Sequence, residues 1–252
     1  MITLISPAKS LDYNTAVPIA QSTQPRFPDK TGKLVSAASN LSKKRLKDIM
    51  PVSDNLIELN YGRYKDFHNQ PERQAIYAFS GDVYTGFEAR TLDEAAIDYA
   101  QDHLRILSGL YGLLRPLDNI RPYRLEMGTR WAPRYKSLVD FWGDAIAQQL
   151  SHDLAEQNSN IILNLASQEY FASVTKGVKK LDAEIVNVDF RQDGPDGPRF
   201  ISFAAKKARG MMARFVCEHR LDDIESVKSF DSDGYAYDAS GSDQNTLRFI
   251  RA

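Results

Sequence analysis

The sequence has one cysteine, no long apolar run and almost no net charge. A single cysteine, Cys217, excludes a disulfide framework, a CxxC zinc site and a dithiol redox pair, and its apolar neighbours predict a buried, unreactive thiol. The first residues lack the basic start and the apolar stretch of a signal peptide, and no segment approaches the roughly 18 apolar residues of a membrane span. We therefore expect a cytoplasmic protein without membrane contact.

Recognisable metal and cofactor motifs are also missing. The histidines have no regular spacing to one another or to carboxylates, as a metal site would need; they are His68, His103, His152 and His219. Neither a Walker lysine motif nor a GxGxxG pattern occurs. The sequence therefore predicts no metal site and no cofactor.

The charges cancel overall but are segregated along the chain. There are 32 lysines and arginines against 33 aspartates and glutamates, so total charge gives no argument for a nucleic-acid partner. Three stretches are strongly basic: 26–47 with a balance of +6, 105–136 with +5 and 199–220 with +5. Acidic stretches at 82–102 and 222–243 compensate them. A near-neutral protein can still present a basic face if such stretches meet.

Short apolar runs alternate with helical patterns through the whole sequence. Runs rich in β-branched and aromatic residues predict strands at 2–5, 75–79, 104–107, 161–165, 184–190, 199–203 and 246–250. Amphipathic patterns predict helices at 32–50, 55–67, 92–102, 138–157, 168–175 and 204–219. A turn at 193–197 predicts a hairpin between two of the strands. We therefore expect an α/β fold of one domain, 1–252, with a mixed β-sheet flanked by helices.

Small residues, followed by polar and aromatic ones, end four of the predicted strands. If these strands are parallel, their ends share the sheet edge where open α/β sheets bind ligands. The predicted cleft contains Ser6, Lys9, Ser80, Tyr84, Ser108, Arg115, Arg121 and Arg124. An enzyme acting on a phosphate-bearing or nucleic-acid substrate could use Lys9, Asp12, Asp82 and Glu169 there. For a single strand, Ser-Gly would be ordinary turn chemistry.

The first basic stretch ends in two predicted helices joined by a tight turn, at 41–67. This segment resembles the helix-hairpin-helix of DNA-binding proteins, in which backbone N–H groups contact a phosphate regardless of sequence. The predicted DNA contacts are Lys43, Lys44, Arg45, Lys47, Val52 and Ser53. Pro51 stands where a glycine is usual and has no N–H to donate, so an ordinary pair of packed helices is the alternative.

Six segments in this order and spacing resemble the YaaA family of bacterial peroxide stress resistance proteins (UPF0246 type). They lie at 6–13, 61–67, 79–87, 107–118, 122–128 and 164–171. The resemblance implies a cytosolic protein that protects cells from hydrogen peroxide by limiting unincorporated iron and its damage to DNA. It also implies double-stranded DNA binding through a helix-hairpin-helix on an unusual α/β fold. It assigns no catalytic residue.

Two functions follow from these observations. The first is a DNA-binding protein of peroxide stress, which we expect to be a monomer that contacts the duplex backbone without sequence specificity and is not an enzyme. The second is an enzyme whose substrate occupies the strand-end cleft.

Overall fold

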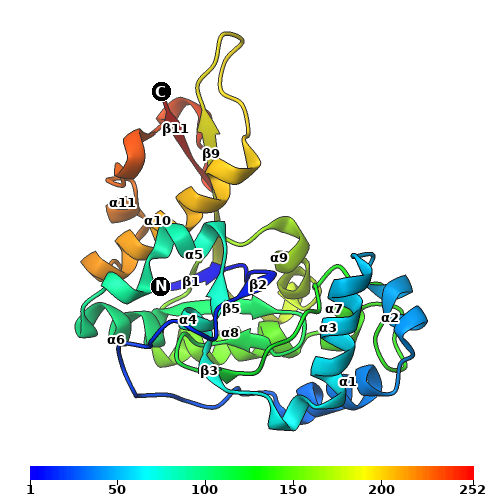
Figure 1. The fold of residues 1–252 in the computed structure, drawn as a ribbon. Coiled ribbons are helices and arrows are strands. Elements are labelled where there is room, and N and C mark those ends of the chain that lie inside the picture. The colour runs from blue at the N-terminus through cyan, green and yellow to red at the C-terminus, as the bar shows by residue number, and fades with distance from the viewer.

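A seven-stranded mixed sheet forms the centre of the computed structural model, which describes residues 1–252 (Figure 1). Its five inner strands are parallel and its two edge strands are antiparallel. In order across the sheet they are β10 (Tyr235–Tyr237), β11 (Thr246–Arg251), β9 (Glu184–Gln192), β8 (Ile161–Asn164), β1 (Ile2–Ile5), β5 (Leu104–Ser108) and β6 (Gly112–Leu114). The expected α/β class and mixed sheet are confirmed.

Helices cover both faces of the central strands, since all four residues of β1 are buried. Figure 1 shows α5 and α10 above these strands and α8 below them. The helices are α1 (Pro28–Ser39), α2 (Lys43–Ile49), α3 (Asp54–Lys65), α4 (Ala75–Ala78), α5 (Asp82–Phe87), α6 (Glu94–His103), α7 (Leu138–Trp142), α8 (Ala145–Glu156), α9 (Gln168–Thr175), α10 (Ser202–His219) and α11 (Ile224–Val227). Two small sheets pair β2 (Ser10–Leu11) with β4 (Phe79–Ser80) and β3 (Arg73–Gln74) with β7 (Asn119–Ile120).

The apolar stripe of α10 lies in the main core, as its sequence pattern predicts. The buried residues of this helix include Ala208, Met212, Val216 and Cys217. Cys217 is 1% exposed, and burial raises the pKa of its thiol. The buried, unreactive thiol expected from the sequence is thereby confirmed.

Glycines allow α5 and α10 to cross in backbone contact. A Cβ atom at Gly210 would lie 1.8 Å from the carbonyl oxygen of Val83, and one at Gly86 would lie 2.1 Å from that of Lys207. Each site thus faces the backbone of the other helix, which cannot rotate away as a flexible side chain could.

We expect Gly210→Ala to destabilise the protein by about 1–3 kcal/mol or more, because the added methyl must push the two helices apart. Gly32→Ala in α1 is the matched control, since a Cβ there would meet no atom within 4 Å. That change should stabilise the helix by about 0.5–1 kcal/mol. Urea unfolding of both variants measures the difference, and a Gly210 variant as stable as the wild type would contradict the close crossing.

Two predicted strands are wrong. Residues 75–78 form the buried helix α4, leaving only Phe79–Ser80 as strand β4. Residues 199–203 lead into α10, and the expected hairpin is reduced to one bridge between Gln192 and Arg199. Beyond that bridge the Phe200 and Phe203 side chains are exposed, so the alternating pattern there buries no strand face. Strand β10 lies in a stretch that the sequence pattern leaves irregular.

Two long predicted helices are each divided. Residues 32–50 form α1 and α2, because Asn40 caps the end of α1 and the Ser42 hydroxyl accepts the Arg45 N–H at 3.2 Å to begin α2. Residues 138–157 form α7 and α8, separated at Gly143, whose φ of +57° ends the first helix.

Candidate functional site

The ends of β1 and β8 meet where the chain order across the sheet reverses, the usual position for a ligand in an open α/β sheet. Ser6 follows β1 and Ser167 follows β8. The Ser167 N–H donates to the Ser6 hydroxyl oxygen at 2.9 Å. The hydroxyl of Tyr84 donates to the Ser6 carbonyl at 3.2 Å. The parallel strands β1 and β8 therefore bring Ser6 and Ser167 together, and α5 adds Tyr84; of these three residues, Ser6 and Tyr84 were predicted for the cleft.

The charged groups of this cleft pair with one another. Lys9 Nζ lies 3.1 Å from one oxygen of Glu126, and Arg124 donates to the other oxygen at 3.0 Å. Glu169 accepts the N–H of Gly128 at 3.0 Å. Lys9, Arg124 and Glu126 line a cavity of about 10 Å³ together with Tyr170. The cleft as it stands has room for little more than a water molecule.

Buried tyrosines fill the floor of the cleft. Ser108 lies 2.7 Å from the hydroxyl of Tyr123, and both side chains are buried. Burial raises the pKa values of Tyr84, Tyr123 and Tyr170. These phenols therefore stay protonated at neutral pH, and the Tyr84 hydroxyl donates to the Ser6 carbonyl.

One of the predicted acids, Asp12, is engaged in a turn. Asp12 accepts N–H groups of Thr15 and Asn14 and pairs with Arg90 at 3.1 Å. The Thr15 hydrogen bonds, with help from Asn14 and Arg90, lower the pKa of Asp12 to about 2, so this carboxylate holds a turn together. Asp82 begins α5, next to the exposed Ser80 of β4.

The structure separates Arg115 and Arg121 from the cleft. Arg115 follows β6, which runs antiparallel to β5, so it lies near the opposite edge of the sheet and binds Asp118 at 2.9 Å. Arg121 pairs with Glu72 at 2.7 Å and lines a different cavity, beside α1. The predicted cleft therefore loses two of its three arginines.

The predicted helix-hairpin-helix segment, residues 41–67, contains helices α2 and α3, which pack on each other around a small core. We call this segment the basic hairpin. Leu46, Met50, Ile57 and Tyr64 are buried there together with Ala38 of α1. Ser53 is the N-cap of α3, and its side chain makes no capping hydrogen bond. The first N–H groups of α3 thus lack an intrahelical or side-chain acceptor, as phosphate contact at this turn would require.

Three of the four hairpin cations have carboxylate partners. Lys43 lies 2.5 Å from Glu58, Lys47 pairs with Asp54, and Arg45 lies 3.7 Å from Asp48. Lys44 is exposed and has no such partner. All these pairs are solvent-exposed, so each is weak and can exchange its carboxylate for a phosphate.

A second basic segment packs against the hairpin, through a contact that the sequence pattern does not reveal. Trp131 lies against the small core of the hairpin and brings residues 129–136 onto α1–α3. This loop contributes three exposed cations that make no ion pair: Arg130, Arg134 and Lys136. We call residues 28–65 and 129–136 together the basic face; it holds eleven cations against four carboxylates, a balance of +7.

A groove of about 930 Å³ runs between α1 and this loop. Lys30, Lys33 and Arg134 line it, together with Tyr135, whose side chain is 52% exposed. The third basic stretch, in α10, lies at the far end of the molecule from α1 and α2 (Figure 1). Two of the three basic stretches therefore share one region.

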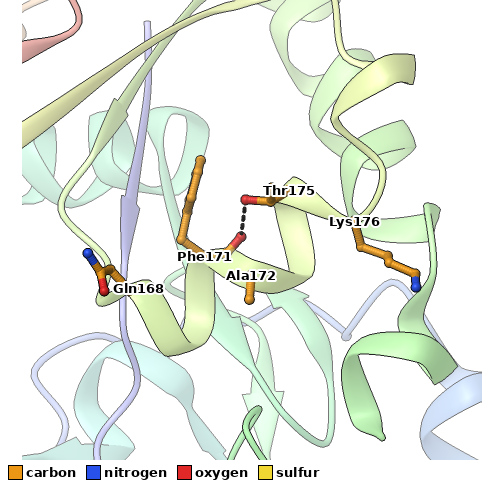
Figure 2. A pocket seen from close by; sticks show the side chains of 5 residues that line it. All are labelled: Gln168, Phe171, Ala172, Thr175 and Lys176. Atoms are coloured by element: carbon orange, nitrogen blue, oxygen red, sulfur yellow. Dashed lines mark hydrogen bonds between the residues drawn. The ribbon is translucent and has the colours of Figure 1, made fainter. Parts of the chain in front are cut away.

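A shallow depression of about 420 Å³ follows α9 (Figure 2). Gln168 and Lys176 lie at its opposite ends, and Thr175 donates to the carbonyl of Phe171 at 3.3 Å within the helix. Lys176 pairs with Asp140 at 2.8 Å. Because no polar groups converge on this depression, we assign it no chemistry.

Comparison with protein-family models matches residues 1–241 to the family described as "Peroxide stress protein YaaA". The chain belongs to this family. It is 57% identical over 252 residues to a UPF0246 protein of Rhizorhabdus wittichii, which covers 100% of this chain and 99% of the relative. UPF0246 proteins of Paraburkholderia phytofirmans and Alteromonas mediterranea are 47% and 46% identical over 258 and 256 residues; each match covers 100% of this chain and 98% of the relative.

Membership of the YaaA family confirms the resemblance that the six sequence segments carry, and it places this chain among peroxide stress proteins. No three metal-ligating side chains converge, and no helix combines the length and apolar character that crossing a bilayer requires.

Proposed function

We propose that this YaaA-family chain binds double-stranded DNA through the phosphate backbone, without reading the sequence, and so limits iron-dependent damage to DNA during peroxide stress. The observation that carries the proposal is the packing of Trp131 on the hairpin core, because it joins two basic segments into one face. A face with a balance of +7 on a chain of net charge −1 is the electrostatic pattern of a phosphate-binding surface.

The hairpin supports contact with backbone phosphates rather than with base edges. No side chain caps the N–H groups at the start of α3, and the lysine side chains of the hairpin are long and exposed. Such groups bind a phosphate wherever the duplex presents one and carry no sequence information. The binding should therefore be nearly equal for unrelated sequences.

Counterion release supplies a physical link to iron. Duplex DNA holds a layer of condensed cations, and a protein that neutralises phosphates displaces them. Fe²⁺ held in that layer would be displaced in the same way, away from the sugars and bases that its reaction with peroxide damages. The basic face would then protect DNA without a metal site of its own.

A salt titration on short duplexes tests the proposal. We expect log affinity to fall linearly with log salt, with a slope of about −4 to −5 if five phosphates are neutralised. Two duplexes of unrelated sequence should give the same line. No binding at low salt would refute the proposal, and DNA cleavage in a parallel series with magnesium would favour the strand-end cleft instead.

A further inference from the structure

A second cavity, of about 400 Å³, adjoins the basic groove along α1. Its size lies in the range of small-ligand sites, roughly 300–1,000 Å³. Pro28 and Gly32 line both this cavity and the groove. We call it the Arg121 pocket; none of its lining residues belongs to the strand-end cleft.

Hydrogen bonds within the chain fix the walls of the Arg121 pocket. Thr31 of α1 donates its hydroxyl to the carbonyl of Leu110 at 3.2 Å. The N–H of Arg121 donates to the hydroxyl of Tyr111 at 2.9 Å. The N–H of Asn119 donates to the carbonyl of Thr23 at 2.8 Å. A ligand would therefore meet a site that is already formed, with little ordering cost.

An ion pair between Arg121 and Glu72 forms the polar end of the pocket. Arg121 lies 2.7 Å from Glu72, while its Nε is buried without a hydrogen-bond partner. Because Glu72 neutralises the guanidinium, a phosphate or carboxylate gains little net attraction here. The side chains of Arg121 and Glu72 are 28% and 34% exposed, so a neutral ligand that both accepts from Arg121 and donates to Glu72 fits better.

Part of the pocket lining is apolar or aromatic. Phe67 is 5% exposed, and the Arg121 guanidinium lies 5.9 Å from its ring centre. Tyr111 is 4% exposed, and Pro25 and Pro28 also line the pocket. Aromatic walls with donors and acceptors at one edge suit a planar ring whose edge carries hydrogen-bonding groups.

We propose that the Arg121 pocket binds a nucleobase, with its ring against the apolar part of the lining and its edge on Arg121 and Glu72. The base can come from two sources: a free base or nucleoside, or a base displaced from DNA that lies in the adjoining groove. Only the second source rests on the proposed DNA binding.

Two titrations separate these sources. In the first, the four nucleosides and their free bases are titrated into the protein and followed by saturation-transfer NMR and calorimetry. In the second, duplexes with a mismatched 2-aminopurine report an unstacked base by increased fluorescence. We expect saturable binding in at least one titration. Binding of a nucleoside without any DNA binding would support the pocket and remove the proposed function.

Matched variants assign the binding to the pocket. Arg121→Met should weaken it about tenfold or more, since it removes hydrogen bonds from a charged donor, whereas Lys206→Met on α10 should not. Gly32→Leu places three more carbons at the shared rim than Gly32→Ala and should weaken it similarly. Thermal melting checks that each variant folds. No saturable signal in either titration, or wild-type affinity in both Arg121→Met and Gly32→Leu, would overturn the proposal.

Discussion

Replacing Asp153 with alanine is expected to destabilise the fold by about 3–5 kcal/mol, because a buried arginine then loses its counter-charge. Asp153 of α8 has no exposed side-chain surface, and Arg105 of β5 has 4%. Arg105 Nε donates to one carboxylate oxygen at 2.6 Å, and Arg26 donates to both oxygens at 2.5 and 3.1 Å. In a chain of this size the loss corresponds to a fall in Tm of roughly 10 °C.

The three residues of this cluster join three parts of the fold. Arg26 belongs to the segment between β2 and α1, which has no helix or regular strand and is held largely by side chains. Arg105 also donates to the carbonyls of Gln101 and Leu104, so its guanidinium cannot leave the interior when Asp153 is removed. The variant should therefore loosen the 14–29 segment as well as the packing of α8 on β5.

Acid should remove the same stabilisation. Burial raises the pKa of Asp153, but the hydrogen bond from Arg26 and the charges of Arg105 and Arg26 outweigh it and leave the pKa below the usual 3.8. The folded state thus binds this proton less tightly than the unfolded chain does. The contribution is complete above a pH of about 4 and is lost as the pH falls further.

Urea unfolding at neutral and acidic pH measures both effects. The Asp153→Ala variant should unfold at lower urea at neutral pH and show a weaker acid dependence than the wild type. Asp144→Ala is the control at the N-cap of the same helix, because the Asp144 side chain makes no capping hydrogen bond and pairs with Lys180 in solvent, so its loss should change little. Equal losses in the two variants would show that the buried cluster contributes no more than a surface pair.

The local sequence pattern was sufficient to predict most strands of the central sheet. The runs at 2–5, 104–107, 161–165, 184–190 and 246–250 all form strands, since β-branched residues bounded by small or polar ones suit a buried sheet. Residues 75–79 are equally apolar, and periodicity alone cannot tell a buried helix from a strand there. The turn of α4 is fixed from outside, by N–H bonds from Ala75 and Ile76 to the carbonyls of Asp118 and Pro116.

Some residues of the candidate sites could be placed from the sequence pattern, and others could not. Ser6, Lys9 and Glu169 could be brought together from sequence because each follows a strand of a parallel sheet, directly or closely. Arg115 could not be excluded, because the chain reverses at Gly112, whose φ is +74°, and returns antiparallel. The contact of Trp131 with the hairpin core joins segments that are far apart in the chain and has no local signature.

The largest effect on DNA binding is expected from reversing three charges, one in each segment of the basic face. Lys33→Glu in α1, Lys44→Glu in α2 and Arg130→Glu in the loop change exposed cations that make no ion pair, so no buried carboxylate is left alone. If each contacts one phosphate, the slope of log affinity against log salt should become shallower by about 3. At 0.1 M salt the affinity should fall roughly several hundredfold, equally for all sequences.

A triple variant with the same net charge separates local contact from overall repulsion. Lys179→Glu, Arg199→Glu and Lys206→Glu are exposed, make no ion pair and lie outside the basic face. They should lower the affinity only slightly and leave the slope unchanged, because they remove no phosphate contact. If both triple variants bind equally weakly with the wild-type slope, total charge alone governs binding. The contact of Trp131 with the hairpin core would then stabilise the fold without contributing to DNA binding.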